Sequence, residues 1–424
     1  MSTRLDEYEA LSHIAGIAFK TGPPRHTGVE LEWLVRDSGD PTATVPIERL
    51  ESALAPLAPL AELPHGGRIT LEPGGQVELS SRPETSPVRC LRETGADLAL
   101  LREALADAGL EVAGYGLEPY RTPGRVLDQP RYGAMEAYFD RNGPWGRMMM
   151  RATASIQVNV DAGDDSDEAT GYRFRWALLH RLGPVLIAAF ANSPLWQGRP
   201  TGWLSSRQAV WAHMDPGRTR PPVPDGDPRT AWARYALDAG VLCLRRPAPA
   251  PWTAPPELSL RSWLRGAPTG PPPTLGDAEY HLTTLFPPIR PRGWLELRMI
   301  DAQQDDDWTV PALLVTALLD DPDTARAAHR ATEPLTGGAD VPPWTVWLRA
   351  ARDGLADPAL LACARDCFAL AGAALERTGT PPDLQQALAR FARRYTDRGR
   401  CPADDRLEAL RTGPVPDLTE GVSR

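Results

Sequence analysis

The chain has 424 residues and a formal net charge of −9, with 42% hydrophobic and 24% charged residues. This length allows one large domain or two to three ordinary ones, and the apolar content is sufficient for a sizeable core. Because the net charge is negative and no basic stripe is present, we expect no nucleic-acid partner.

The N-terminal segment MSTRLDEYEALSHIAG carries acidic residues where a signal peptide needs an apolar run. The longest apolar stretch, 182–196, is too short and too interrupted to span a bilayer. The five cysteines are odd in number and scattered: Cys90, Cys243, Cys363, Cys367 and Cys401. We therefore expect a cytoplasmic protein with reduced thiols and no membrane partner.

Periodicity of the apolar residues predicts both helices and strands. Helices are predicted at 6–19, about 89–109, 167–192 and 344–396. Strands are predicted at 27–35, 67–72, 75–81, 111–116, 149–161 and 293–300. The elements do not follow a strict βαβ order, and Pro73-Gly74-Gly75 is typical of a hairpin turn. This pattern favours an α+β fold with a largely antiparallel sheet.

A proline-rich region covers about residues 216–274. It could be an interdomain linker, but its embedded pieces TAWARYALDAGVLCL and LSLRSWL are apolar enough to pack. We therefore prefer long loops that cross the surface of a single domain spanning residues 1–424. A flexible tail is expected at about 412–424, where the sequence is charged.

The strand GVELEWLV places two carboxylates on one face. Glu30 and Glu32 are two residues apart, so they point to the same side of an extended chain. Val29, Leu31 and Trp33 take the opposite side. Like charges at neighbouring positions on one face are unfavourable unless a cation neutralises them.

The same alternation in the other strands also gathers polar side chains on one face. Glu72 stands at the edge of the hairpin turn. The aligned polar positions are Gln76, Glu78 and Ser80 in QVELS; Arg151, Thr153, Ser155, Gln157, Asn159 and Asp161 in RATASIQVNVD; and Glu296 and Arg298 in WLELRMI.

Two interpretations of this polar face remain open on the pattern alone. One is a solvated face, which is common in antiparallel sheets. The other is a site for a hard cation such as Mg²⁺, because carboxylate and amide oxygens occur without a Cys or His cluster. Mg²⁺ most often serves phosphate chemistry, and Arg298 lies two residues after Glu296, where it could clamp a phosphate. No P-loop or dinucleotide fingerprint is present.

Several segments together resemble the glutamate–cysteine ligase superfamily of the plant and bacterial type. They are GVELEW, GGRITLEPGGQVELSS, RYGAMEAYF, TASIQVNVDAG, ANSPLWQGRPTGWLSSRQAVW, AWARYALDAGV and YHLTTLFPPIRPRGWLELRMID. They run in the family's order from about residue 25 to 320, and PADD at 402–405 matches near the end. More narrowly, the chain resembles the actinobacterial branch that acts in ergothioneine biosynthesis.

The resemblance implies a single catalytic domain with a glutamine-synthetase-like carboxylate–amine ligase fold. In such a fold a curved, largely antiparallel sheet has a polar concave face, with helices packed on the other face. The implied reaction is ATP-dependent ligation of the γ-carboxylate of glutamate to cysteine through γ-glutamyl phosphate, with two or three Mg²⁺ ions. The alternatives are a ligase of the same fold with another amine acceptor, and a non-catalytic descendant that binds metabolites. We expect a monomer or a weak homo-oligomer.

The resemblance also implies a set of metal ligands. Glu30 and Glu32 match the family's E-x-E ligands, and Glu72 and Glu78 resemble the acidic hairpin positions. Gln157 occupies a position where some branches use a histidine to bind metal.

Further roles follow from the same resemblance. Glu296 would bridge to the nucleotide-bound metal, Arg298 would stabilise the transferring phosphoryl group, and Gln157 would also contact the nucleotide side. Arg207 is our candidate for clamping a substrate carboxylate, because a guanidinium can bind one in a bidentate manner. Candidates for lining the glutamate pocket are Thr153, Ser155 and Trp203.

Other residues keep two interpretations. Arg290 and Arg292 could assist nucleotide binding or be solvated. The indoles of Trp196, Trp203 and Trp211 could stack on adenine, although burial in the core is the preferred interpretation.

Overall fold

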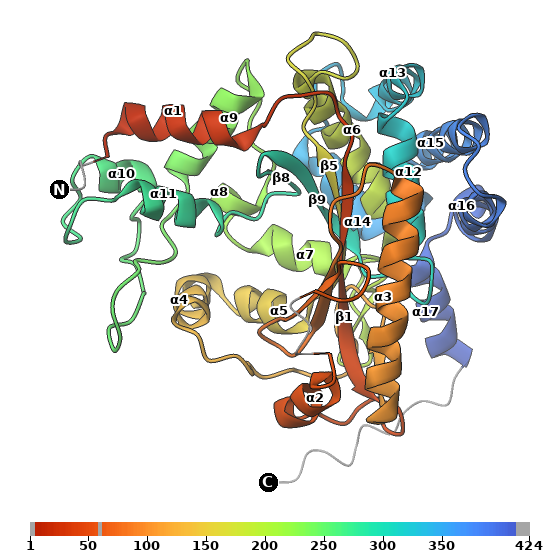
Figure 1. The fold of residues 1–424 in the computed structure, drawn as a ribbon, viewed down its shortest axis with the longest axis horizontal. Helices are drawn as coiled ribbons and strands as arrows, with labels where there is room; N and C mark the ends of the chain where they lie inside the picture. The colour runs from red at the N-terminus through yellow and green to blue at the C-terminus, as the bar shows by residue number, and fades with distance from the viewer. Residues whose placement is uncertain (1–4, 58–61, 413–424) are drawn as a thin grey trace.

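A seven-stranded sheet forms the centre of the protein, which we describe from a computed structural model covering residues 5–57 and 62–412 (Figure 1). The strand order is β2-β3-β1-β5-β9-β8, with β4 pairing with β1, and every pairing in this sheet is antiparallel. The strands are β1 (Thr27–Asp37), β2 (Arg68–Leu71), β3 (Val77–Ser80), β4 (Leu110–Ala113), β5 (Ser155–Asp161), β8 (Ile289–Pro291) and β9 (Trp294–Asp301). The expected antiparallel α+β fold is confirmed, whereas residues 413–424 of the expected flexible tail lie outside the described residues.

The hairpin between β2 and β3 forms at the predicted turn. The backbone N–H of Glu72 donates to the carbonyl of Gln76, and that of Gly75 donates to Glu72, each at 2.9 Å. Gly75 has a φ of 86°, a left-handed conformation that glycine adopts without steric cost. The turn thus places Glu72 at the end of the hairpin, next to the polar face.

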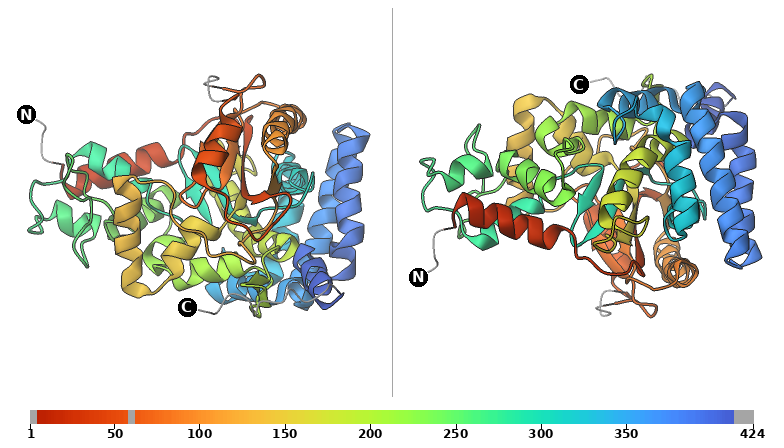
Figure 2. Two further views of the ribbon diagram at one scale, coloured as in Figure 1. Left: turned by 90° about the horizontal axis from the view of Figure 1, so that it is seen from below. Right: turned by 90° about the horizontal axis from the view of Figure 1, so that it is seen from above.

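The apolar face of the sheet packs against a layer of helices. α3 (Pro87–Asp107), α6 (Tyr172–Phe190) and α12 (Thr309–Leu319) contact β1, β9 and β5 respectively. Nearly all of α6 and α12 is buried, because further helices cover their outer sides. These are α13 (Pro322–Ala331), α14 (Trp344–Asp353), α15 (Pro358–Arg377) and α16 (Pro382–Arg394). In both views of Figure 2, α15 and α16 lie at the opposite end of the molecule from α1.

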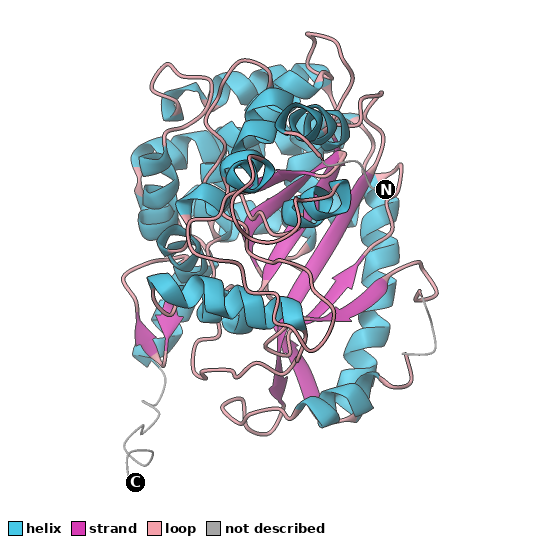
Figure 3. Ribbon diagram, turned by 90° about the vertical axis from the view of Figure 1, so that its left-hand side faces the viewer, coloured by secondary structure: helices cyan, strands magenta, loops and turns pink. Residues whose placement is uncertain are grey.

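Helices also stand over the polar face, which the sequence did not predict. Figure 3 looks toward this face and shows helices in front of the strands. They include α4 (Pro130–Phe139), α5 (Trp145–Ala152) and α7 (Ser206–His213). The polar face therefore lies beneath helices instead of facing solvent across its whole area.

The remaining elements surround these layers. They are α1 (Glu7–Ala18), α2 (Ile47–Leu54), α8 (Pro216–Thr219), α9 (Pro228–Asp238), α10 (Leu260–Leu264), α11 (Leu275–Leu282), α17 (Pro402–Thr412), the strand pair β6 (Leu195–Trp196) and β7 (Arg199–Pro200), and the 3-10 helices Asp140–Asn142, Glu333–Leu335, Gly354–Ala356 and Thr396–Arg398.

The predicted strand 149–161 is wrong in its first part. Residues up to Ala152 belong to α5, and β5 begins only at Ser155. Gly146, Met149 and Met150 are buried at helical spacing, and methionine, arginine and alanine are good helix formers. The alternation of polar residues in this segment therefore does not reflect one continuous strand, because the segment contains the end of a helix and the strand that follows it.

The predicted helix 344–396 is divided into three. Gly354 follows α14 and Gly379 follows shortly after α15, and both glycines have a positive φ. Pro358 and Pro382 open the next two helices, where a missing backbone N–H costs nothing.

The proline-rich region contributes to the main core. Asp227 caps α9 and Pro228 opens it, which fixes the start of the helix. Trp232 and Leu237 of this helix, and Trp263 of α10, are buried in the main hydrophobic cluster. These contacts show that the proline-rich region is packed against the rest of the protein. The single-domain organisation stays a prediction.

Within the described residues, α15 is the helix that is long and apolar enough to cross a membrane by length and composition alone. Its Cys363, Cys367 and Ala371 are fully buried in the main core, where it packs against α12 and α16. A core helix of a soluble protein has the same composition. All five cysteines are free and buried, as expected.

Leu31 tests how far the sheet depends on the apolar side of β1. It is 0% exposed in the main core, directly behind the glutamates of the same strand. We expect Leu31→Ala to lower the free energy of unfolding by about 2–5 kcal/mol, because it leaves a cavity that the core cannot fill. Urea unfolding measures the change, and Leu275→Ala, at a 41% exposed leucine, is the control that should shift stability little.

Candidate active site

A cavity of about 310 Å³ lies between the polar face of the sheet and the helices above it. Strands β1, β3 and β9 and the β2–β3 hairpin supply its floor, and α4, α5 and α7 supply its walls. The lining residues are Glu30, Glu32, Glu72, Pro73, Gln76, Glu78, Arg131, Tyr132, Met135, Met149, Met150, Thr153, Gln157, Arg207, Trp211, Thr283, Phe286, Arg290, Arg292 and Arg298. Four carboxylates and five guanidinium groups thus share one small space.

The acidic half of the cavity is built by the register of neighbouring strands. Glu32 of β1 stands directly opposite Glu78 of β3, and Glu30 opposite Gln157 of β5. Glu72 approaches from the hairpin end. Like charges directly opposite each other on one face of a sheet destabilise it, so this arrangement is not explained by sheet stability.

Neutral groups, not cations, hold these glutamates. Asn159 donates to Glu30 at 3.1 Å, Ser155 donates to Glu32 at 2.9 Å, and Thr70 donates to Glu78 at 3.0 Å. Within residues 5–57 and 62–412, none of the four glutamates forms an ion pair within 4.0 Å of an Arg, Lys or His nitrogen.

The unneutralised charge raises the pKa of these carboxyl groups. Burial, followed by repulsion from Glu296 and Glu78, raises the pKa of Glu30 to about 7. Burial and the charges of Glu32 and Glu78 raise the pKa of Glu72 to about 8. Glu78 also has a raised pKa, from burial and from Glu32. The acidic half therefore favours the uptake of positive charge, either as protons or as a cation.

The basic half of the cavity is arranged around Glu296. Arg290 donates to both oxygens of its carboxylate, at 2.5 and 3.0 Å, and Arg298 donates to Oε1 at 3.2 Å. Arg292 lies 3.7 Å away. Burial alone would raise the pKa of Glu296, but the positive charges of Arg290 and Arg298 hold this pKa at about 2. Glu296 is 0% exposed and orients the arginines above it.

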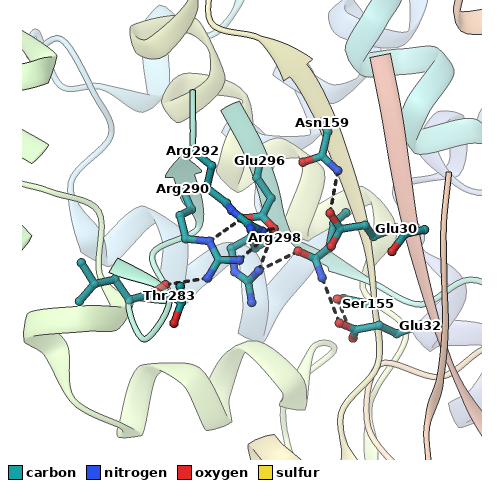
Figure 4. A network of polar contacts seen from close by, with 12 residues as sticks. Glu30, Glu32, Ser155, Asn159, Thr283, Arg290, Arg292, Glu296 and Arg298 are labelled. Atoms are coloured by element: carbon teal, nitrogen blue, oxygen red, sulfur yellow. Dashed lines mark hydrogen bonds and ion pairs between the residues drawn. The ribbon is translucent and has the colours of Figure 1, made fainter. Parts of the chain in front are cut away.

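Gln157 connects Glu32 of the acidic half with Arg298 of the basic half, two residues that are labelled in Figure 4. Its Nε2 donates to Glu32 at 3.0 Å, and its Oε1 accepts from Arg298 at 2.7 Å. The pairing of β5 with β9 is irregular next to it, between Ile156 and Val158. The neutral amide thus connects the acidic and the basic side while keeping them apart.

Arg207 lines the cavity and has two donor nitrogens without a hydrogen-bond partner. It is 2% exposed, and its Nη2 donates to the carbonyl of Arg298 at 2.8 Å. Its Nε and Nη1 have no hydrogen-bond partner, and Asp301 is 3.9 Å from Nη1. Buried, unpartnered guanidinium nitrogens are unusual, because they carry a desolvation cost. A bound carboxylate would supply the missing acceptors.

The structure brings most of the predicted site residues together. Those that line the cavity are Glu30, Glu32, Glu72, Glu78, Thr153, Gln157, Arg207 and Arg298. Glu296 lies behind them under Arg290, and Ser155 holds Glu32. Thr153 arrives from the end of α5, not from a strand, and its hydroxyl donates to Met149.

Trp203 is the prediction that the structure corrects. It packs against the main core, and it is not among the described residues that line the cavity. Trp211, which comes later in the chain on α7, lies in the wall instead, and the Arg207 guanidinium is 6.0 Å from its ring centre. Position in the family segment alone could not show which indole faces inward.

Several lining residues were not predicted from the sequence. Arg131 and Tyr132 come from α4, Met149 and Met150 from α5, and Phe286 from the loop before β8. Period-two alternation detects only residues on strands, so it misses walls built by helices and loops. The segment RYGAMEAYF, whose resemblance to the family was noted, was the one available signal for α4.

The donor set fits a hard divalent cation by its chemistry, since it offers carboxylates without thiols or imidazoles. In the part of the chain that the structure describes, no three His, Cys, Asp or Glu side chains form a ready ligand group. The four glutamates therefore share a cavity without forming a compact ligand set.

Comparison with known proteins places the chain in a family. The model of the family described as glutamate-cysteine ligase family 2 (GCS2) matches residues 26–421. Glutamate–cysteine ligase EgtA of Mycolicibacterium smegmatis is 40% identical over 403 residues, 94% of this chain and 90% of that protein. EgtA of Mycobacterium tuberculosis H37Rv is 39% identical over 424 residues, 98% and 93% of the two chains. The chloroplastic glutamate–cysteine ligase of Arabidopsis thaliana is 31% identical, covering 82% and 64%.

Solved structures agree on the fold. Glutamate–cysteine ligase (gshA) from Francisella tularensis in complex with AMP has a TM-score of 0.54 at 14% identity, covering 94% of this chain and 87% of that one. A bifunctional glutathione synthetase from Pasteurella multocida has a TM-score of 0.50 at 14% identity, covering 96% and 52%. The family model and the relatives thus define the class of protein, an ATP-dependent ligase. The chain belongs to glutamate–cysteine ligase family 2, which confirms the resemblance.

The acidic half makes stability depend on pH. The folded pKa values of Glu72 and Glu30, about 8 and about 7, exceed their ordinary value of 4.5. The folded protein therefore binds more protons than the unfolded chain between these values, and its free energy of unfolding falls as the pH rises from about 5 to 8. We expect Glu72→Gln to make this fall shallower in metal-free protein.

Urea unfolding in EDTA at several pH values measures the effect. Glu51→Gln, at an exposed glutamate outside the cavity, is the matched control and should keep the wild-type slope. An unchanged slope in Glu72→Gln would contradict the electrostatic description of this site.

Proposed function

We propose that this enzyme joins glutamate to cysteine through γ-glutamyl phosphate, giving γ-glutamylcysteine, ADP and phosphate. The observation that carries the proposal is the division of one cavity into four unpaired glutamates and an arginine cluster, with Gln157 between them. Joining a carboxylate to the γ-phosphate of ATP brings two anions together. Such an encounter needs cations on one side and fixed guanidinium groups on the other.

The acidic half supports the binding of Mg²⁺, two or three ions in our expectation. Glu30, Glu32, Glu72 and Glu78 would hold them, because their carboxylates are buried, repel one another and lack counter-charges. Bound Mg²⁺ would supply neutralisation of the nucleotide phosphates. Gln157 would offer an amide oxygen at the boundary of the two halves.

The basic half supports stabilisation of the transferring phosphoryl group. Arg298 faces the cavity, and its direction is fixed by hydrogen bonds to Glu296 and Gln157. Because Glu296 is already bound to Arg290 in a bidentate manner, its main effect on catalysis would be to position the arginines. Contact of Glu296 with a nucleotide-bound metal, as the resemblance implies, would require this ion pair to open.

The wall formed by α7 and the end of α5 supports the binding of an amino-acid substrate. Arg207 would receive a substrate carboxylate on its two free nitrogens. Thr153 lines the same cavity, and Ser155 acts through Glu32. The methionines of α5 give the adjoining surface an apolar character.

The biological setting follows the relatives. We propose that γ-glutamylcysteine serves as sulfur donor for ergothioneine and that the enzyme works in the cytoplasm on small molecules alone. We further propose a monomer or weak homo-oligomer without nucleic-acid or membrane partners.

Release of ADP tests the proposed reaction. Purified enzyme with Mg²⁺, ATP and glutamate should release ADP at a rate that cysteine stimulates more than other amines do. Arg298→Lys should lower kcat by about 10²–10³, because one fixed donor to the developing phosphoryl charge is lost. Arg102→Lys, at a half-buried arginine outside the cavity that is paired with Asp306, is the control. Stimulation by a different amine would assign another acceptor, and no stimulation by any amine would refute ligation.

Substitution of Arg207 separates carboxylate binding from nucleotide binding. We expect Arg207→Lys to raise the KM for glutamate or for cysteine by about 10–100-fold, because charge-assisted hydrogen bonds contribute about 1.5–3 kcal/mol each. The KM for ATP should change by less than about twofold. Steady-state kinetics with each substrate varied in turn provides the measurement, and a selective rise in the KM for ATP would contradict this role.

A further inference from the structure

A β-bulge in β9 turns Asp301 toward the polar face of the sheet. Glu296 of β9 pairs with Asn159 of β5, and Asp301 pairs with Ser155 further along. The two β5 residues are four positions apart and share a face, whereas five positions separate the two β9 residues. In a regular strand Asp301 would therefore lie on the apolar face. The register shift between these pairs gives β9 one residue more than β5, and a bulge of this kind re-aims the side chains that follow it.

Asp301 lies next to Arg207 but outside the cavity, and three donors hold its carboxylate. It is 2% exposed and is not among the described residues that line the cavity. Its Oδ2 accepts from the backbone N–H of Asn192 at 2.9 Å and from Ser193 Oγ at 2.7 Å. Its Oδ1 accepts from Ser205 Oγ at 3.0 Å. These bonds leave the carboxylate little freedom to move.

Gly116 leaves room for this carboxylate. A Cβ at Gly116 would lie 2.3 Å from Asp301 Cγ, which is too close for any side chain. The φ of Gly116 is not positive, so its conformation does not require glycine. The glycine therefore permits the close approach of Asp301 to the backbone.

Two serines connect Asp301 to the first turn of α7. The hydroxyl of Ser205, the N-cap of this helix, donates to Asp301 and accepts from the backbone N–H of Gln208 at 3.2 Å. The hydroxyl of Ser193 donates to Asp301 and accepts from the backbone N–H of Arg207 at 3.1 Å. These two N–H groups are among those that a helix leaves without an internal partner. Asp301 therefore holds the part of the backbone from which the Arg207 side chain extends.

Asp301 also compensates the buried charge of Arg207. Among the described residues, it is the carboxylate that lies within 4.0 Å of an Arg207 nitrogen, at 3.9 Å from Nη1. Burial lowers the pKa of Arg207, and the charge of Asp301, followed by that of Glu32, opposes this effect. Because its oxygens already accept three hydrogen bonds, Asp301 supplies a counter-charge without occupying Nη1. The guanidinium thus keeps donors for another carboxylate.

We propose that Asp301 is the positioning residue for Arg207: it holds the first turn of α7 through two serines and balances the guanidinium charge without occupying its free donors. The inference rests on the proposed binding of a substrate carboxylate by Arg207, and it adds the residue that sets the direction of that guanidinium. Asp301 lies outside the described lining of the cavity, so its effect on a substrate passes through Arg207. Without the charge of Asp301, attraction to Glu32 draws the guanidinium toward the acidic half.

Asp301→Asn tests this role in the complete enzyme with Mg²⁺ and ATP. Asparagine has nearly the same size, but it removes the charge and places an amide N–H against one of the donors. We expect it to raise by about tenfold the KM for the same amino-acid substrate, glutamate or cysteine, that Arg207→Lys affects. The KM for ATP should change by less than about twofold. Steady-state kinetics with each substrate varied in turn measures both values.

A double-mutant cycle separates positioning from a general structural effect. Because Asp301 acts through Arg207, Asp301→Asn should raise this KM by less than about twofold in an enzyme that already carries Arg207→Lys. A general loosening of the fold would instead add the same increase of about tenfold in both backgrounds. The coupling between the two substitutions is therefore the decisive measurement.

Asp97→Asn is the matched control. Asp97 is 0% exposed and accepts from the backbone N–H groups of His65 and Gly67 at 3.1 and 2.8 Å. It lies on α3, which packs against the apolar face of the sheet. This substitution should lower the free energy of unfolding in urea, because it also weakens a buried carboxylate's hydrogen bonds, while every KM stays within about twofold of the wild type.

Ser193→Ala provides a second variant if Asp301→Asn does not fold. It keeps both charges and removes the hydroxyl between the Asp301 carboxylate and the Arg207 backbone N–H. We expect a rise of about threefold in the same KM, the size expected for the loss of a hydrogen bond. This rise should also disappear in the Arg207→Lys background.

The outcomes separate this inference from the proposed reaction. If Arg207→Lys raises the KM but Asp301→Asn and Ser193→Ala leave it unchanged, the inference alone is overturned. Additive effects in the double variant, or an equal rise in the KM for ATP, would also overturn it.

Calorimetry with glutamate and cysteine in the presence of Mg²⁺ and ADP measures binding without ligation. Coupling of the substitutions at Asp301 and Arg207 in this measurement, in an enzyme without ligase activity, would support the inference and refute only the proposed reaction. Amino-acid affinity that neither substitution changes would overturn the role of Arg207 and this inference together.

Discussion

The site depends on electrostatic repulsion between carboxylates on two neighbouring strands. Glu32 and Glu78 face each other across β1 and β3, and within the described residues neither has a cationic partner. The two carboxylates are kept opposite each other because the other sides of the same strands carry Leu31, Val77 and Leu79, which are fully buried. Burial of this apolar side fixes the register, and a shift by one residue would turn the apolar side chains toward the cavity. The packing of the core thus maintains a charge arrangement that is unfavourable in itself.

The arginine half follows a different principle. Glu296 is fully buried, yet it is ionised, since Arg290 and Arg298 stabilise its charge. Removing one partner of such a buried pair is costly, because it leaves the other charge without compensation. The pair therefore gives Arg298 a fixed direction, which a solvated arginine would lack. A preorganised guanidinium needs little reorganisation when charge develops on a phosphoryl group.

The sequence predicted the floor of the site better than its walls. Alternation along β1 and β3 was sufficient to place Glu30, Glu32 and Glu78 on one face, because strand geometry is regular. It failed at residues 149–152, which belong to helix α5 and not to a strand. Arg131 and Trp211 reach the cavity through the packing of α4 and α7 over the sheet. Such tertiary contacts cannot be read from the periodicity of a single segment. The sequence therefore did not distinguish Trp211, which lines the cavity, from Trp203, which was predicted to do so.

Gln157 explains how the two halves coexist in one cavity. Opposite charges attract strongly where the groups are buried and the local dielectric is low, and direct pairing of Glu32 with Arg298 would neutralise both groups. The amide prevents this because its N–H donates to Glu32 while its carbonyl accepts from Arg298. A glutamate at this position would add to the acidic repulsion, and an arginine would pair with the acids. A neutral side chain with both a donor and an acceptor is therefore the residue type that leaves the carboxylates free for cations and the guanidinium free for phosphate.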